Sequence, residues 1–133
     1  MAGYSGTPLP KKLGIKEGHV VALVGAPDEF TLALPERAAL RKSLRGSKPL
    51  DVVLLFCRRE KDLVARFPKA KARIAKNGGL WVCWPKKSSG VPTDLGDGVV
   101  RGLGLAGGLV DNKVCAIDET WSALRFVWRT KDR

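Results

Sequence analysis

Residues Asp51 to Cys57 read Asp-Val-Val-Leu-Leu-Phe-Cys, and this stretch decides the fold. Its apolar residues follow one another without polar alternation, which is typical of a strand covered on both faces, as in a parallel sheet. Successive side chains of a strand point to opposite faces. We therefore expect Val53 and Leu55 to face one layer of the core, and Val52 and Leu54 to face the other.

Two further apolar runs predict strands beside this one. His19 to Val24 is stopped by Gly25-Ala26-Pro27, and Leu80 to Trp84 is stopped by Pro85. Neither run alternates, so each is typical of a strand that is buried on both faces.

A helical segment is predicted between these strands, over Glu60 to Lys76. Its apolar residues recur at helical spacing, at Leu63, Phe67, Ala70 and Ile74. Pro68 lies inside the segment and predicts two short helices or one kinked helix. Asn77-Gly78-Gly79 predicts its end.

The C-terminal third predicts a helix followed by a hairpin. Thr93 is placed to cap a helix in which Leu95, Val99 and Leu103 share one face. Leu109 to Ile117 and Ser122 to Arg129 then predict two strands with a short link between them.

Two segments nearer the N-terminus are less distinctive. Asp28 is placed to cap a short helix through Leu34. Arg37 to Arg45 fits a helix or an edge strand, and we favour the edge strand. Glycines and prolines in Met1 to Lys12 suit neither a helix nor the interior of a sheet, so this segment predicts an irregular arm.

Strands that alternate with helices and end in a hairpin predict an α/β protein. We expect a reduced Rossmann-like three-layer sandwich, with a mainly parallel sheet and a C-terminal antiparallel hairpin. A length of 133 residues predicts one domain. Residues 1–14 are interpreted as an N-terminal arm and residues 15–133 as the single α/β domain.

The charge is the strongest anomaly of the composition. The chain has 24 Lys and Arg against 13 Asp and Glu, a formal net charge of +11. This excess favours an anionic partner, either a phosphate-bearing ligand or nucleic acid. Six cations of the helical segment fit the nucleic-acid interpretation, namely Lys61, Arg66, Lys69, Lys71, Arg73 and Lys76. The oligomeric state stays open.

No apolar run approaches the ~20 residues that a membrane span needs, and the N-terminus has no charged start followed by an apolar core. We therefore expect a cytoplasmic protein without a membrane partner. Cys57, Cys83 and Cys115 form no paired motif, so we interpret them as free, buried thiols. No pattern predicts a metal site.

A Gly-x-Gly-x-x-Gly pattern spans residues Gly102 to Gly107. Dinucleotide binding needs this pattern after a strand and at the start of a helix. Here it ends a predicted helix and precedes a strand, so we interpret it as a flexible helix end.

The most informative pattern is positional. Ligands of parallel α/β sheets bind outside the carboxyl ends of the strands. The residues beyond these ends supply cations and hydroxyls, which attract phosphate or carboxylate. The predicted ligand-binding residues are Gly25, Pro27, Asp28, Arg58, Arg59, Lys86, Lys87, Ser88 and Ser89.

Several short segments together resemble a family of short bacterial proteins classed only as a domain of unknown function (number three-zero-five-two). They are Tyr4 to Leu9, Lys12 to Ile15, Val24 to Pro27, Trp84 to Lys87 and Gly108 to Val114. The resemblance covers essentially the whole chain. It implies a bacterial origin and a cytoplasmic location, and no established activity.

The order of strands and helices also resembles the C-terminal half of class I methyltransferases, and Leu13 to Ala26 looks like the lead into their cofactor strand. Pro27 and Asp28 stand where that family places a glycine-rich loop. Because the loop lacks the glycines that let backbone approach a ligand, we expect no cofactor and no micromolar binding of S-adenosylmethionine.

These observations favour a non-catalytic binding or regulatory module with a basic, anion-attracting edge. The alternative is a divergent methyltransferase-like enzyme that acts on an anionic substrate. A third interpretation is a nucleic-acid-associated protein.

Overall fold

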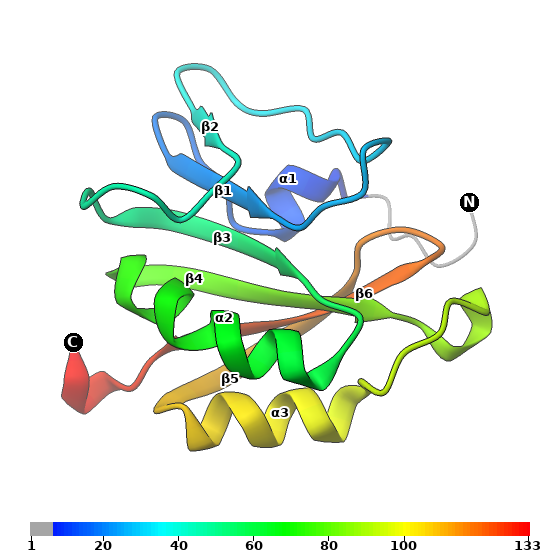
Figure 1. Ribbon diagram of the computed structural model, residues 1–133. Helices are drawn as coiled ribbons and strands as arrows, with labels where there is room; N and C mark the ends of the chain where they lie inside the picture. Colours follow the sequence, from blue (N-terminus) through cyan, green and yellow to red (C-terminus); the bar gives the residue numbers. More distant parts are fainter. Residues whose placement is uncertain (1–6) are drawn as a thin grey trace.

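The computed structural model describes residues 7–133 and contains a six-stranded sheet in the order β2-β1-β3-β4-β6-β5 (Figure 1). The strands are β1 (Val20–Val24), β2 (Ala39–Arg41), β3 (Leu50–Phe56), β4 (Ile74–Pro85), β5 (Leu109–Ala116) and β6 (Trp121–Trp128). β2, β1, β3 and β4 pair in parallel, whereas β6 is antiparallel to both β4 and β5. The predicted Rossmann-like α/β fold with its antiparallel hairpin is confirmed.

The two faces of the sheet are covered unequally (Figure 1). The helices α2 (Glu60–Arg73) and α3 (Asp97–Ala106) cover one face. The single-turn helix α1 (Leu9–Lys12) and the segment 26–34 cover the other. The third layer of the sandwich is therefore thin. Two short 3₁₀ helices, η1 (Lys87–Ser89) and η2 (Thr130–Asp132), complete the elements.

β3 is the centre of the core, as its sequence predicts. Val53 and Leu55 pack in the cluster under α2 and α3. Val52 and Leu54 pack in the cluster on the α1 side. All four are buried, with exposed fractions of 2% or less.

The helical segment differs from its prediction in two ways. α2 is one continuous helix, although Pro68 lies inside it. Pro68 has no amide hydrogen, so the carbonyl of Val64, four residues earlier, lacks its usual partner in the helix. Both residues are exposed, so water can bond to that carbonyl instead. The second difference is that Asn77-Gly78-Gly79 does not end the helix but lies within β4.

The glycines of β4 allow a bulge against β3. The pairing shifts from Leu50 with Ile74 to Val52 with Gly79, so β4 carries extra residues between the two pairs. A Cβ atom on Gly78 would lie 2.8 Å from the carbonyl oxygen of Asp51. Only a residue without a side chain fits this close approach.

Three other local predictions have mixed outcomes. The edge strand that we favoured in Arg37 to Arg45 is confirmed as β2. No helix follows Asp28, because the chain makes a turn and then runs irregularly to residue 38. α3 begins after Gly96 rather than at Thr93. The Thr93 hydroxyl is used earlier, where it accepts a bond from the Leu95 amide at 3.0 Å.

The N-terminal segment is more regular than predicted. Leu9–Lys12 forms α1, with Pro10 in its first turn, where a missing amide hydrogen has no cost. The following Leu13 is fully buried, and the indole Nε1 of Trp81 donates to its carbonyl at 3.0 Å. The part of the predicted arm from Met1 to Gly6 lies outside the described residues.

The Gly-x-Gly-x-x-Gly pattern is a packing motif rather than a flexible helix end. A Cβ atom on Gly104 would lie 2.0 Å from the ring of Phe126, and one on Gly107 would lie 2.4 Å from the ring of Phe67. Gly102, by contrast, has open space around it. Two of the three glycines therefore let α3 approach β6 and α2 closely.

We expect Leu54→Ala to cost about 2–5 kcal/mol in the free energy of unfolding, because it leaves a cavity between β3 and the α1 layer. Urea melts measure the loss. Val64→Ala is the control, since Val64 is 54% exposed on α2 and should change stability by less than about 0.5 kcal/mol. A loss below about 1 kcal/mol at Leu54 would show that β3 is not the central strand.

The two kinds of glycine in α3 should respond oppositely to alanine. Gly102→Ala should stabilise the protein by about 0.5–1 kcal/mol, because alanine loses less conformational entropy in a helix and meets open space here. Gly104→Ala should destabilise it by about 1–3 kcal/mol through overlap with Phe126. Thermal and urea melts of both variants test the difference. Equal effects would contradict the packing role of Gly104.

Candidate functional site

The carboxyl ends of β1, β3 and β4 lie at one edge of the sheet (Figure 1). Three cavities of about 460, 470 and 480 Å³ open at this edge, and all three are lined by the loop that follows β1. We call the first of them the carboxyl-edge cavity. Its lining residues are Gly25, Ala26, Pro27, Asp28, Glu29, Phe56, Arg58, Asp62, Arg66 and Trp121.

The place of this cavity follows from the strand order. β1 has β2 on one side and β3 on the other, so the chain changes direction across the sheet between β1 and β3. The loops after these two strands therefore separate and leave a crevice, which is where open α/β sheets bind ligands. Gly25 lines the crevice from the end of β1, and Phe56 and Arg58 line it from the end of β3.

Two arginines of the cavity make long contacts with its other lining residues. Arg66 on α2 donates from Nη1 to the carbonyl oxygen of Phe56 at 3.5 Å. The guanidinium of Arg58 lies over the ring of Trp121, 6.0 Å from its centroid. The Trp121 ring in turn packs edge-on against Phe56, with centroids 5.0 Å apart. These contacts make one side of the cavity aromatic and cationic.

Negatively charged residues also line the carboxyl-edge cavity. Asp28 and Glu29 come from the loop after β1, and Asp62 comes from the first turn of α2. The cavity thus holds two guanidinium groups and three carboxylates. Its charge is mixed, whereas the sequence predicted a basic edge.

The structure brings only part of the predicted site together. Gly25, Pro27, Asp28 and Arg58 share the carboxyl-edge cavity. The other predicted residues line none of the three cavities of this edge; they are Arg59, Lys86, Lys87, Ser88 and Ser89. Anion binding by this second group stays a prediction.

Hydrogen bonds fix the loop after β4 in place. The amide of Lys86 donates to the carbonyl of Thr120 at 2.7 Å, and η1 follows. The Ser89 hydroxyl donates to the carbonyl of Lys86 at 2.6 Å and accepts from the amide of Val91 at 3.2 Å. Ser89 is therefore occupied by its own loop, while Lys87 and Ser88 are exposed.

Sequence reasoning missed the residues that come from α2 and β6. Asp62 and Arg66 are one helical turn apart, so both can face the end of β3, and this spacing was available in the sequence. Trp121 reaches the cavity only because β6 pairs beside β4 in antiparallel register, with Trp121 opposite Pro85. No local signal places it there.

The N-terminus of α2 already has carboxylates beside it. The amide of Glu60 donates to Oδ1 of Asp94 at 2.7 Å, and the first turn carries Glu60 and Asp62. These carboxylates stabilise the start of α2, because a helix N-terminus carries free amides and a partial positive charge.

Cys57 follows Phe56 of the cavity lining, and its thiol has a raised pKa. Burial raises the pKa of Cys57 to about 11, although the neighbouring Arg66 lowers it in part. The thiol is therefore protonated at neutral pH, and thiols react as thiolates. Burial likewise raises the pKa of Cys83 and of Cys115. Cys57 and Cys83 are free and buried as predicted, and Cys115 is half-buried.

Most cations of the predicted nucleic-acid stripe are used inside the protein. Lys71 donates to the carbonyl of Gly107 at 2.8 Å, and Lys76 lies 3.5 Å from the ring centroid of Trp128. Arg73 donates to carbonyls of the loop before β3, at 2.8 Å for Arg45 and 2.6 Å for Lys48. These groups hold the fold together rather than forming an unpaired row of charges.

Comparisons with known proteins give a clear fold and no family. No protein-family model matches the chain, and no curated protein matches it. The resemblance to the short bacterial family therefore stays a prediction.

No helix in residues 7–133 has the length and apolar character required to cross a membrane.

Solved methyltransferases share the fold. Fibrillarin from Aeropyrum pernix, in complex with natively bound S-adenosyl-L-methionine, has a TM-score of 0.61 at 13% identity, over 94% of this chain and 70% of that chain. A TehB-like methyltransferase from Corynebacterium glutamicum has a TM-score of 0.60 at 8% identity, over 96% and 91%. A SAM-dependent methyltransferase from Aquifex aeolicus has a TM-score of 0.58 at 15% identity, over 87% and 85%. The predicted methyltransferase-like fold is confirmed.

We expect Gly25→Ala to destabilise the protein more than Gly90→Ala. Both glycines have positive φ, at 74° and 76°, so alanine is strained at both by about 1 kcal/mol. A Cβ atom on Gly25 would also lie 2.8 Å from the Phe56 carbonyl oxygen, whereas Gly90 has open space. Urea melts measure the excess, and equal losses would contradict a packing role for Gly25.

Proposed function

We propose that the carboxyl-edge cavity binds a small ligand that carries a positive charge beside a flat group, with S-adenosylmethionine as the representative of this class. The observation that carries the proposal is the coincidence of a mixed-charge, aromatic cavity with the crevice between β1 and β3. Three features of the cavity support it.

The first feature is the carboxylates. Asp28 and Glu29 line the cavity from the loop after β1, and Asp62 lines it from α2. A sulfonium or ammonium group gains coulombic energy from them.

The second feature is the pair of arginines. Arg58 and Arg66 present guanidinium groups to the same cavity, and guanidinium binds carboxylate through two parallel hydrogen bonds. A ligand with an amino-acid end, which carries a carboxylate and a cation, therefore meets both kinds of group here.

The third feature is the neighbouring space. The cavity of about 470 Å³ on the β2 side shares Gly25 to Asp28 with the first and is lined by apolar residues at Leu23, Phe30, Leu32 and Leu40. This apolar lining fits a planar base. The basic residue Lys42 stands at the end of β2 in this cavity.

The loop after β1 limits how tightly such a ligand is held. The space beside Gly25 is filled by the Phe56 carbonyl, and no helix starts in residues 25–38. The sequence predicted no micromolar binding on this ground. Side chains, rather than the backbone of a glycine-rich loop, must supply the contacts.

Methyl transfer is the second candidate function. The cavity of about 480 Å³ adjoins the first and shares Arg58 and Trp121 with it, which leaves space for a methyl acceptor beside a methyl donor. For this function, Arg66 is left to bind the carboxylate of the donor and Arg58 faces an anionic acceptor, as in the enzyme interpretation of the sequence. A non-catalytic binding module would bind the donor without turnover.

Calorimetry with S-adenosylmethionine and S-adenosylhomocysteine tests the proposal. The two ligands differ in the sulfonium charge, so we expect the charged one to bind about tenfold more tightly, a difference of about 1.4 kcal/mol. Asp62→Asn should reduce this preference. Asp132→Asn, an exposed carboxylate in η2, is the matched control and should leave it unchanged.

Two outcomes would contradict the proposal. Absence of binding by either ligand, with the variants folded, would remove it. Equal affinity for both ligands would show that the carboxylates do not recognise a cation. Binding without transfer of a labelled methyl group to small anionic acceptors would favour the non-catalytic module over the enzyme.

A further inference from the structure

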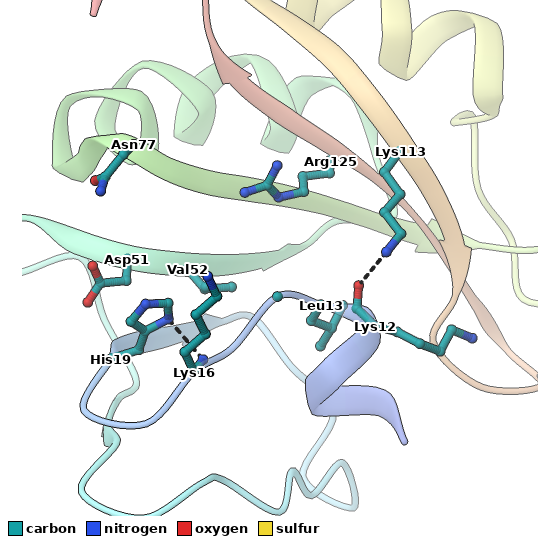
Figure 2. Close-up of a pocket in the computed structure, with 10 residues that line it drawn as sticks. Lys12, Leu13, Lys16, His19, Asp51, Val52, Asn77, Lys113 and Arg125 are labelled. Atoms are coloured by element: carbon teal, nitrogen blue, oxygen red, sulfur yellow. Dashed lines mark hydrogen bonds between the residues drawn. The ribbon is translucent and has the colours of Figure 1, made fainter. Parts of the chain in front are cut away.

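A fourth cavity, of about 340 Å³, lies at the opposite edge of the sheet (Figure 2). We call it the amino-edge cavity, because His19 and Asp51 line it from the starts of β1 and β3. Arg125 of β6 and Lys113 of β5 line it from the hairpin. Leu13 and Lys16 line it from the segment between α1 and β1.

The charge of the amino-edge cavity is strongly positive. Lys16, Lys113 and Arg125 line it together with one carboxylate, Asp51. Oδ2 of Asp51 already accepts a hydrogen bond from the amide of Val20 at 2.8 Å. A fourth lining cation, Lys12, bonds through Nζ to the carbonyl of Ala116 at 3.2 Å and lies turned away in Figure 2.

Arg125 is the central group. It is half-buried on the α1 side of the sheet, and in residues 7–133 no carboxylate oxygen lies within 4.0 Å of its guanidinium. Burial lowers the pKa of Arg125, and repulsion from Arg133 lowers it further. A half-buried cation without an anionic partner has an unfavourable solvation energy, which a bound anion would offset.

The position of Arg125 depends on Gly79. A Cβ atom on Gly79 would lie 2.5 Å from Nε and 2.9 Å from Cζ of Arg125. The guanidinium therefore lies directly against the backbone of β4, and Figure 2 shows it extending along that strand toward Asn77. Glycine at position 79 therefore leaves room for the guanidinium of Arg125, which lines the cavity.

Further donors line the cavity on different sides of Arg125, Lys113 on the hairpin side and His19 on the β1 side (Figure 2). Nδ1 of His19 accepts from the amide of Lys16 at 3.1 Å, so a neutral ring carries its hydrogen on Nε2, which is left to donate. Lys113 gives one hydrogen to the carbonyl of Lys12 at 3.2 Å, and its ammonium has two more. Asn77 contributes an amide from the bulge of β4.

We propose that the amino-edge cavity binds the phosphoryl group of a small phosphate monoester, with Arg125 as its main ligand, Lys16 and Lys113 as further cations that attract it, and His19 as a neighbour that lines the same cavity. A phosphoryl dianion gains more than a single carboxylate does from several cations that line one cavity. The proposal does not depend on the ligand of the carboxyl-edge cavity, which lies at the other end of the parallel strands.

His19 makes the proposal directly testable, because it is the only histidine of the chain. Its imidazole signals in an NMR spectrum need no assignment. At fixed pH and ionic strength, we expect inorganic phosphate to shift them saturably. Acetate at the same concentration should produce a much smaller shift.

Variants then separate a built site from general attraction to a basic protein. Arg125→Gln should weaken phosphate binding by about tenfold or more, as expected for the loss of a charged partner. Lys69→Gln removes an exposed cation of α2 and is the matched control, which should retain the affinity. Arg58→Gln should also retain it.

Three results would overturn the proposal. If acetate shifts the imidazole as much as phosphate does, the site is not selective for a phosphoryl group. If Lys69→Gln weakens binding as much as Arg125→Gln, the effect is general charge. If the double variant Lys86→Ala and Lys87→Ala loses phosphate binding while Arg125→Gln keeps it, the anion binds at the carboxyl edge, as the sequence predicted.

Discussion

The burial of β3 on both faces is the constraint on which the rest of the structure depends. Its neighbours must be covered as well, and 133 residues supply two full helices for only one face. The other face is closed by α1 and the segment 26–34, which anchor through Leu13 and Phe30. This thin layer does not reach across the sheet. Cavities therefore open on its two sides, at the carboxyl edge and at the amino edge.

Close contacts through glycine join the elements of this small core. The Phe56 carbonyl fills the space beside Gly25, and the Phe126 ring fills the space beside Gly104. A glycine pattern that suggests phosphate binding in a sequence thus serves packing in this fold. Gly79 differs in one respect, because the group that fills its space is the guanidinium of Arg125, which itself faces a cavity.

The sequence predicts the fold better than the site, for a physical reason. The continuous apolar runs are local, so β1, β3 and β4 can be recognised from them, and the hairpin follows from its short link. Pro68 and Gly78 led to wrong predictions of where the helix breaks and ends. The cost of Pro68 in a helix depends on its exposure, and the place of Gly78 depends on the neighbouring strand; the local sequence contains neither. Only part of the lining of the carboxyl-edge cavity was predicted. Arg58 follows a strand directly, whereas Trp121 arrives through antiparallel pairing over a long sequence separation.

Net charge and local charge lead to different conclusions about ligands. The formal charge of +11 suggested an anion at the edge where strand ends are followed by lysines and arginines. In the folded chain, α2 and the loop after β1 bring Asp28, Glu29 and Asp62 to that edge, so its cavity is of mixed charge. The cavity around Arg125 is the one of clearly positive charge, because four cations line it with one carboxylate, Asp51, whose Oδ2 accepts a bond from the Val20 amide. Because electrostatic attraction falls with distance and is screened over about 10 Å, the ligands proposed for the two cavities follow from the local balance of charge and not from the net charge.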